Sequence, residues 1–184
     1  MPRDIQENDV DQKNDTRELY RQEFDALDSR KKGSWGERAV IKEADDLGHV
    51  ILLDHWDAPN LHGFDCVSYD PERGELHIWE AKNWNGKLSE RDLTAWQDIT
   101  QHGEPRKGFR DSWCEIIRSI PEGPVRNSVK DAINEGRVYY HLRTGPETEI
   151  TAKLEERLLN DASVPGANYD YKKYSHDYMR NIGA

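Results

Sequence analysis

The sequence is poor in cysteine, in apolar runs and in basic residues. Its two cysteines, Cys66 and Cys114, are too few for a disulfide framework, and we expect small buried residues in a protein of a reducing compartment. No apolar run approaches the length that crosses a bilayer. The N-terminus is acidic and polar, so no cleavable secretory signal is visible.

The shortage of positive charge bears on the partners of the protein. The net charge is −10, which is unfavourable for binding nucleic acid. Acidic residues exceed basic ones in residues 1–28 and 49–83, whereas residues 84–145 are close to neutral. This distribution fits an acidic cytosolic domain, and it also fits a carboxylate-rich metal site whose cation changes the local field.

Several common catalytic signatures are also missing. There is no phosphate-binding Gly-rich loop, no Ser-His-Asp order and no nucleotide-binding fingerprint. The seven histidines are scattered, and none has the spacing of a His-Glu-x-x-His zinc motif. The carboxylates are therefore the remaining candidates for catalytic or metal-binding residues.

The length of 184 residues fits one domain, and six tryptophans predict a fold held by aromatic packing. We expect an acidic, partly flexible arm at 1–28 with a short helix from about Asp15, a core domain at 29–165, and a Tyr-rich tail at 166–184. Helical periodicity or strand composition predicts, in order, a helix from Ser34, strand 49–53, a hairpin at 63–84, helices from Ser89, at 109–120 and at 125–133, strand 137–143 and helix 150–160. This order predicts an α/β fold with a mixed central sheet flanked by helices.

The hairpin is the stretch with the clearest chemical pattern. Turn formers at 70–74 separate two β-prone runs, and strand alternation places Glu80 and Lys82 on the same face as Leu76 and Ile78. Charged groups on a core-directed face need partners or a metal ion. Asp65, on the neighbouring strand, is the expected third member of the group.

Asp65 followed by Glu80-x-Lys82 across a hairpin resembles the PD-(D/E)xK nuclease superfamily, with Phe64 in place of its proline. The resemblance covers about residues 33–102 and implies a restriction-endonuclease-like core. It implies Mg²⁺ or Mn²⁺ held by Asp65, Glu80 and the carbonyl of Ala81, with Lys82 orienting the attacking water or stabilising developing charge. It also implies a further carboxylate from an earlier helix, Glu37, and substrate contacts from Gln97 and Gln101. His62, in the loop beside Gly63, fits either a phosphate contact or a loop histidine without a special role.

Each of these residues also has a simpler interpretation. Glu37 completes a capping box with Ser34 as readily as it binds metal. Glu80 and Lys82 fit an exposed ion pair on an edge strand, and Asp65 fits an Asx turn. Gln97 and Gln101 fit a solvated helix face. Tyrosines of the tail, with Lys172 and Lys173, fit either base stacking or a packing stripe.

The resemblance implies a metal-dependent endonuclease, and we expect DNA before RNA as substrate, with tRNA as an alternative. The Gly33–Glu37 opening and the two hairpin strands look most like nuclease toxin domains of bacterial competition systems. That subfamily implies a cognate immunity protein, a cytoplasmic site of action and delivery by secretion within a larger protein. The alternatives are a housekeeping repair or recombination nuclease of the same fold, and a catalytically inactive binding or adaptor domain.

Overall fold

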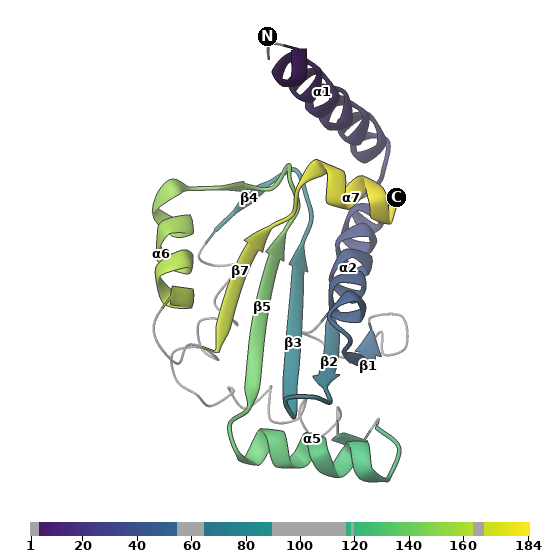
Figure 1. The fold of residues 1–184 in the computed structure, drawn as a ribbon, viewed down its shortest axis with the longest axis vertical. Coiled ribbons are helices and arrows are strands. Elements are labelled where there is room, and N and C mark those ends of the chain that lie inside the picture. The colour runs from purple at the N-terminus through teal and green to yellow at the C-terminus, as the bar shows by residue number, and fades with distance from the viewer. Residues whose placement is uncertain (1–3, 55–64, 90–116, 119, 164–167) are drawn as a thin grey trace.

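The computed structural model describes residues 4–54, 65–89, 117–118, 120–163 and 168–184 (Figure 1). Its helices are α1 Asp4–Asp25, α2 Ser29–Asp46, α5 Pro124–Asn134, α6 Ala152–Ser163 and α7 His176–Ile182. Its strands are β1 Val50–Asp54, β2 Cys66–Asp70, β3 Glu75–Lys82, β4 Lys87–Leu88, β5 Val138–Thr144, β6 Glu149–Ile150 and β7 Tyr169–Lys173.

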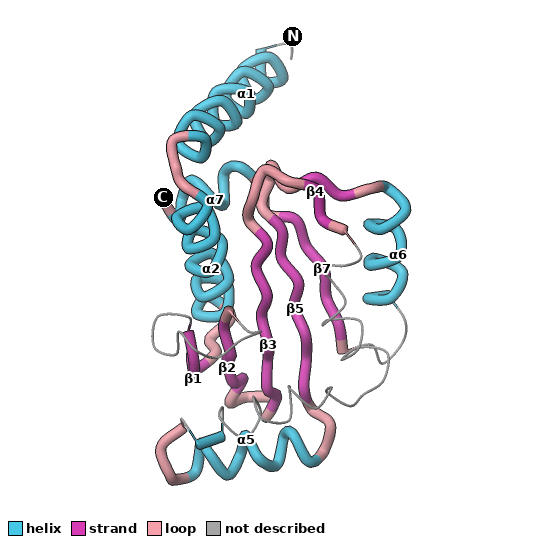
Figure 2. Tube along the Cα trace, turned by 180° about the vertical axis from the view of Figure 1, so that it is seen from behind, coloured by secondary structure: helices cyan, strands magenta, loops and turns pink. Residues whose placement is uncertain are grey.

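Five strands form one sheet in the order β1-β2-β3-β5-β7. The first three make an antiparallel meander, and β5 and β7 continue the sheet parallel to β3. A second, two-stranded sheet pairs β4 with β6. The mixed central sheet flanked by helices that the sequence predicts is therefore confirmed, as Figures 1 and 2 show.

Both faces of the central sheet are covered by helices. On one face, α1, α2 and α7 enclose a core that contains Trp35, Trp79 and Met179. On the other face, α5 and α6 pack on a core that contains Leu76 and Ile78. Successive residues of β3 alternate between these two cores, so the predicted face assignment of this strand is confirmed.

Helix α2 begins earlier than the sequence predicts. Asp28 caps it by accepting a hydrogen bond from the backbone N–H of Lys31, so the Lys-Lys-Gly stretch at 31–33 lies within the helix instead of breaking it. Ser34 is consequently an interior residue, and the expected capping box between Ser34 and Glu37 is wrong. The cap that the sequence pattern assigns to Ser34 is supplied by Asp28, six residues earlier.

Both ends of the chain contain more secondary structure than the sequence predicts. Helix α1 runs from Asp4, well before the expected start near Asp15, and its later turns bury Tyr20 and Phe24. The Tyr-rich segment contributes a fifth strand, β7, and then α7, which begins after a Ser175 cap. Among the described residues, no helix is both long and apolar enough to cross a membrane.

Candidate metal-binding active site

Three charged side chains converge where β2 begins and β3 ends. Asp65 directly precedes β2, and its backbone N–H donates to the carbonyl of Trp79 at 3.1 Å. Its carboxylate Oδ2 accepts a hydrogen bond of 2.7 Å from the backbone N–H of Ala81. The Asp65 carboxylate therefore lies across the end of β3, which differs from the local contact of an Asx turn.

The turn at 70–74 explains why Asp65 reaches this position. Asp70 Oδ1 accepts from the backbone N–H groups of Glu72 and Arg73, and Gly74 adopts a φ of +67° that favours glycine. This turn fixes a register in which Cys66 opposes Trp79. The residue before Cys66 then lies beside the residue after Trp79, which is Glu80.

Glu80 and Lys82 form a close ion pair on this face of β3. Lys82 Nζ lies 2.5 Å from Glu80 Oε1, and their side chains are 22% and 11% exposed, respectively. The pair is therefore largely withdrawn from water, unlike the exposed pair considered as the alternative. A charge pair buried to this degree is held for its chemistry or its geometry more than for stability.

Burial and the nearby carboxylate of Asp65 raise the pKa of Glu80 to about 8, against the lowering effect of Lys82. In its protonated form Glu80 hydrogen-bonds to Asp65, which adds to the rise in its pKa. Two carboxyl groups in contact cannot both ionise easily unless a cation offsets their repulsion. A hard divalent cation supplies that charge and accepts oxygen ligands, so the donor set fits Mg²⁺ or Mn²⁺.

Helix α2 packs directly against the backbone that holds Asp65. A Cβ added at Gly36 would lie 2.6 Å from Asn83 Cβ and 3.4 Å from Ala81 Cβ, so the helix approaches β3 without an intervening side chain. Glu37 follows on the same turn, and its Oε2 is shielded from solvent. The charged groups that shift the pKa of Glu80 are Asp65 and Lys82. A metal-binding role for Glu37 therefore stays a prediction.

The remaining predicted substrate contacts cannot be placed. His62, Gln97 and Gln101 lie outside the described residues, as does the helix expected at 109–120 except for its last residues. The carbonyl of Ala81 stays a predicted ligand. Tyr171 and Tyr174 are buried in the fold, which favours the packing interpretation over base stacking.

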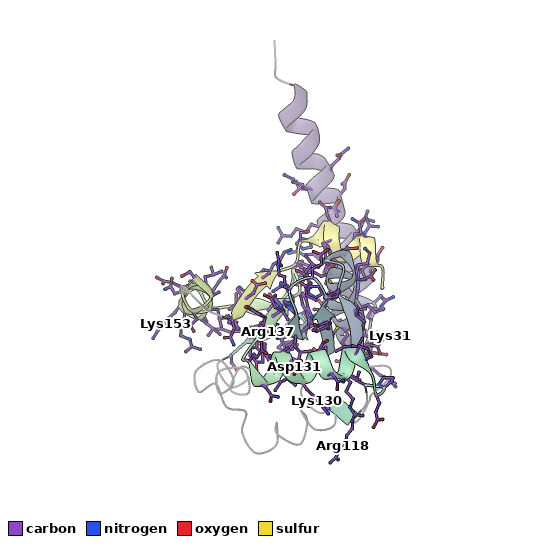
Figure 3. The ribbon with its side chains drawn as sticks, turned by 60° about the horizontal axis from the view of Figure 1, so that its bottom comes forward. Lys31, Arg118, Lys130, Asp131, Arg137 and Lys153 are labelled. Carbon is purple, nitrogen blue, oxygen red and sulfur yellow. The ribbon has the colours of Figure 1, made fainter. Side chains whose placement is uncertain are left out.

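Two hollows with mixed charge lie on either side of Lys87 in β4. One, of about 530 Å³, is lined by residues that include Arg17, Lys87, Thr148 and Lys173. Thr148 Oγ1 lies 2.9 Å from the carbonyl oxygen of Lys82, so this hollow adjoins the strand end that carries the charged group. By contrast, Arg118 and Lys130 project away from the sheet near α5 (Figure 3), towards the end where β3 begins.

A second group of titratable side chains escaped the sequence analysis. His49, Asp70 and His77 are all less than 9% exposed, and His141 stacks on His77 with ring centroids 5.0 Å apart. Burial and the neighbouring His141 lower the pKa of His77 to about 3, and burial also lowers the pKa values of His49 and His141. Spacing motifs miss this group because its members come from different strands; the hairpin register was the signal that could have placed Asp70 beside His77.

Comparison with protein-family models, with curated proteins and with solved structures finds no match to this chain.

Proposed function

We propose that the protein is a metal-dependent nuclease with a restriction-endonuclease-like core. Helix α2, strand β1, strand β2 directly after Asp65, a turn and strand β3 follow in the order that the sequence resemblance implies, and the helix with Gln97 and Gln101 that it expects next lies outside the described residues. The order alone is not specific, because mixed α/β sheets serve many functions. The proposal therefore rests on the site.

One observation carries the proposal: the carboxyl groups of Asp65 and Glu80 contact each other, with the Lys82 ammonium against Glu80. Phosphodiester hydrolysis requires an activated water, neutralisation of phosphate charge and stabilisation of the leaving oxygen. Two carboxylates and a nearby ammonium are the groups that meet these requirements with a hard cation. An ordinary buried ion pair does not explain why a second carboxylate faces Glu80.

In the proposed mechanism, Asp65 and Glu80 would hold a Mg²⁺ ion, and the chemistry supplied there would be polarisation of the phosphate and activation of a water. The Ala81 N–H orients the Asp65 carboxylate by donating to Oδ2. Glu80 must lose its proton to act as a ligand, and Lys82 favours that loss. The Lys82 ammonium, held against Glu80, is the group that would stabilise negative charge developing on the phosphate.

DNA is the proposed substrate, and RNA is the alternative. The net charge of −10 is unfavourable for either polymer, so local cations must supply phosphate contacts. The hollow with Arg17, Lys87 and Lys173 adjoins the strand end that carries Lys82 and offers such cations. Glu147 and Glu149 also line it, which restricts close phosphate contacts to its basic side.

The direct test incubates the purified chain with double-stranded DNA, single-stranded DNA and RNA, each with Mg²⁺, with Mn²⁺ and with EDTA. We expect cleavage of at least one polymer with metal and none with EDTA. The variants Asp65→Ala and Glu80→Gln should be inactive while keeping the circular dichroism of the wild type. Absence of cleavage with every polymer and both metals would leave the inactive binding or adaptor domain as the better interpretation.

A role as the toxin domain of a bacterial competition system is the narrower form of this proposal, supported only by the sequence resemblance. It implies a cognate immunity protein as partner. Expression in bacteria of the wild type and of Asp65→Ala tests it: the wild type should arrest growth and the variant should not. Equal growth of both strains, combined with cleavage in vitro, would favour a housekeeping repair or recombination nuclease.

A further inference from the structure

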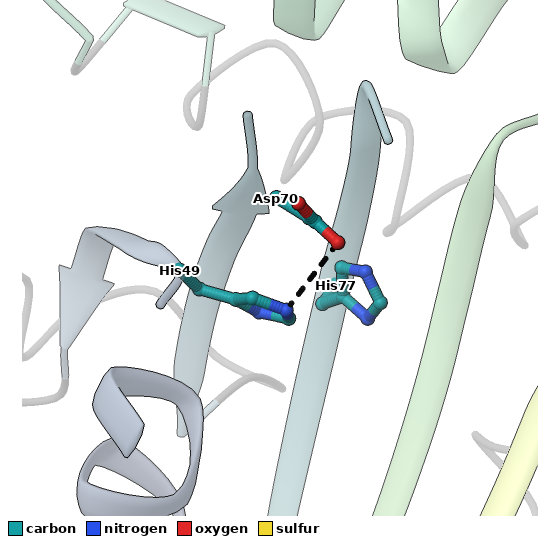
Figure 4. A group of neighbouring side chains, drawn as sticks. All are labelled: His49, Asp70 and His77. Carbon is teal, nitrogen blue, oxygen red and sulfur yellow. Dashed lines mark ion pairs between the residues drawn. The ribbon is translucent and has the colours of Figure 1, made fainter. Parts of the chain in front are cut away.

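The face of the sheet opposite Glu80 carries a cluster of imidazoles near the start of β3. His49 directly precedes β1, His77 lies in β3 and His141 lies in β5. The ring centroids of His49 and His77 are 4.3 Å apart, and Asp70 completes the group from the end of β2. Figure 4 shows His49, Asp70 and His77 facing one another, with the ion pair between His49 and Asp70 dashed.

The ligand-forming atoms of these three residues are already close. One such atom from each of His49, Asp70 and His77 lies within 4.8 Å of the others, and His49 Nε2 is 3.9 Å from Asp70 Oδ2. Asp70 Oδ1 is held by the turn at 70–74, while Oδ2 lies 3.9 Å from His49 Nε2 and 3.8 Å from Nη1 of the exposed Arg73. His49 Nδ1 lies 3.0 Å from Ser68 Oγ, so Nε2 is the nitrogen that faces the group.

The hydrogen-bond chain assigns the proton of His77. His141 Nδ1 lies 3.3 Å from the Asp170 carboxylate, which can only accept, so the Nδ1 proton stays on His141. In a neutral ring His141 Nε2 is then an acceptor, and His77 must donate to it from Nδ1 across 2.7 Å. These hydrogen bonds leave a lone pair, and no proton, on His77 Nε2.

That lone pair lies in an unfavourable position. His77 Nε2 is shielded from solvent and makes no hydrogen bond, yet Glu75 Oε2 lies only 3.3 Å from it. A neutral imidazole nitrogen and a carboxylate oxygen are both acceptors, so their contact is repulsive unless a cation lies nearby. A buried polar atom of this kind is the second sign, besides proximity, that a ligand belongs here.

We propose that His49, Asp70 and His77 form a binding site for a divalent transition-metal ion, with Zn²⁺ as the best fit. Tetrahedral zinc holds its nitrogen and oxygen ligands at about 2.0–2.2 Å, so neighbouring ligand atoms lie roughly 3.3 Å apart. The 3.9 Å between His49 and Asp70 requires only a small contraction to reach this value. Glu75, whose Oε2 lies 3.3 Å from His77 Nε2, could supply the fourth ligand, or a water could.

The second shell of the site is already formed. A zinc-bound histidine ordinarily uses its other ring nitrogen in a hydrogen bond that fixes its orientation. Here Ser68 contacts Nδ1 of His49, and His141 contacts Nδ1 of His77. Imidazole ligands select zinc-like metals over Mg²⁺, so the site differs in chemistry from the Asp65 and Glu80 group on the other face.

Such an ion would connect the start of β1, the end of β2 and β3, and would thereby stabilise the antiparallel half of the sheet. The site does not depend on nuclease activity. If the protein cleaves nucleic acid but binds no Zn²⁺, only the zinc proposal fails. If it binds Zn²⁺ but cleaves nothing, only the nuclease proposal fails.

Isothermal titration of the EDTA-treated full chain with Zn²⁺, in excess Mg²⁺, tests the proposal. We expect one Zn²⁺ per chain, with affinity reduced at least about tenfold in each of His49→Gln, Asp70→Asn and His77→Gln. His176→Gln is the matched control, because His176 pairs with Glu147 elsewhere, and Glu80→Gln controls for the other site. Both controls should bind Zn²⁺ like the wild type.

A measurement on the wild-type chain keeps the proposal testable if the variants fail to fold. Imidazole resonances of His49 and His77 should shift on addition of one equivalent of Zn²⁺, while those of His176 should not. Absence of Zn²⁺ binding, wild-type binding by His49→Gln and His77→Gln, or equal shifts for His176 would each overturn the assignment.

Discussion

Lys82 Nζ lies 2.5 Å from Glu80 Oε1, and the ammonium thereby offsets part of the cost of placing Glu80 beside Asp65. The two residues share a strand face, so the contact is local in sequence. What is not local is Asp65, whose carboxylate lies across the strand end and accepts from Ala81. The first two predictions follow from these two contacts of Glu80, the attractive one with Lys82 and the repulsive one with Asp65.

Replacement of Lys82 by alanine should reduce the rate of DNA cleavage by about 100-fold or more, because the ammonium stabilises charge that develops only in the transition state. Metal binding should weaken but persist, since Asp65 and Glu80 remain while Glu80 loses the ammonium that favours its ionisation. Steady-state cleavage and Mn²⁺ titration by calorimetry measure the two effects separately. Lys42→Ala is the control, because Lys42 makes an exposed pair with Asp46 on α2; a loss of metal binding in Lys82→Ala would indicate a structural role instead.

Replacement of Glu80 by glutamine should abolish cleavage and stabilise the fold at alkaline pH. Burial, together with Asp65, holds the pKa of Glu80 at about 8, above its ordinary value of 4.5. The folded wild type therefore keeps a proton that the unfolded chain releases, and its stability falls as the pH rises between these two values. The slope is at most about 1.4 kcal/mol per pH unit for one proton.

Urea unfolding from about pH 5 to pH 9 measures this difference. The advantage of Glu80→Gln over the wild type should grow up to about pH 8 and stay constant above it. Addition of Mg²⁺ should raise the stability of the wild type more than that of the variant, because the ion binds the ionised carboxylate. A difference in stability that does not vary with pH would mean that Glu80 ionises normally.

Removal of the Arg143 guanidinium should destabilise the fold by roughly 3 kcal/mol, because it leaves the largely buried Glu43 carboxylate, and the half-exposed Asp170 beside it, without their partner. Arg143 is 3% exposed and makes two hydrogen bonds of 2.9 Å to Glu43 and one of 2.6 Å to Asp170. Burial opposes ionisation of both acids, yet hydrogen bonds from Arg143 to each, and from His141 to Asp170, hold their pKa values below the ordinary range. Urea unfolding of Arg143→Met at neutral pH measures the loss.

The same ion pairs predict an acid-dependent component. Carboxylates with lowered pKa values stabilise the fold above their ordinary pKa values of 4.5 and 3.8, and this stabilisation is lost as the pH falls below them. The wild type should therefore lose more stability than Arg143→Met between about pH 6 and pH 3. Lys42→Met is the control, because it removes only the exposed pair with Asp46 on α2, the helix that carries Glu43. It should change the free energy of unfolding by less than about 1 kcal/mol across this pH range.

Local patterns predicted the part of the fold that local chemistry decides. The turn formers at 70–74 fixed the hairpin register, and that register brings Asp65 to Glu80. Helix α5 and strand β5 also lie where composition and periodicity placed them. These features depend on residues close in sequence, so a single chain is enough to read them.

Features that depend on distant residues were missed. Residues 169–173 fall in the expected Tyr-rich tail, but pairing with β5 buries Tyr169 and Tyr171 and makes a strand. His141 was missed for the same reason, because β3 and β5 are adjacent only after the parallel crossover that places His141 beside His77. Pairing of this kind is a tertiary effect that overrides local propensity.

Substitution of Gly36 by alanine should weaken both the fold and the proposed activity, against the usual helix preference. Alanine in a helix interior ordinarily stabilises by up to about 1 kcal/mol relative to glycine. At Gly36, however, the new Cβ would lie 2.6 Å from Asn83 Cβ, so α2 must move away from β3. Because Ala81 N–H orients Asp65, that displacement should also loosen the carboxylate pair and reduce cleavage.

Gly33→Ala is the matched control in the same helix, since a Cβ there meets nothing within 4 Å, and it should stabilise without changing activity. Thermal unfolding and cleavage rates of the two variants check this contrast, and a Gly36→Ala protein as stable and active as Gly33→Ala would show that α2 does not position the site.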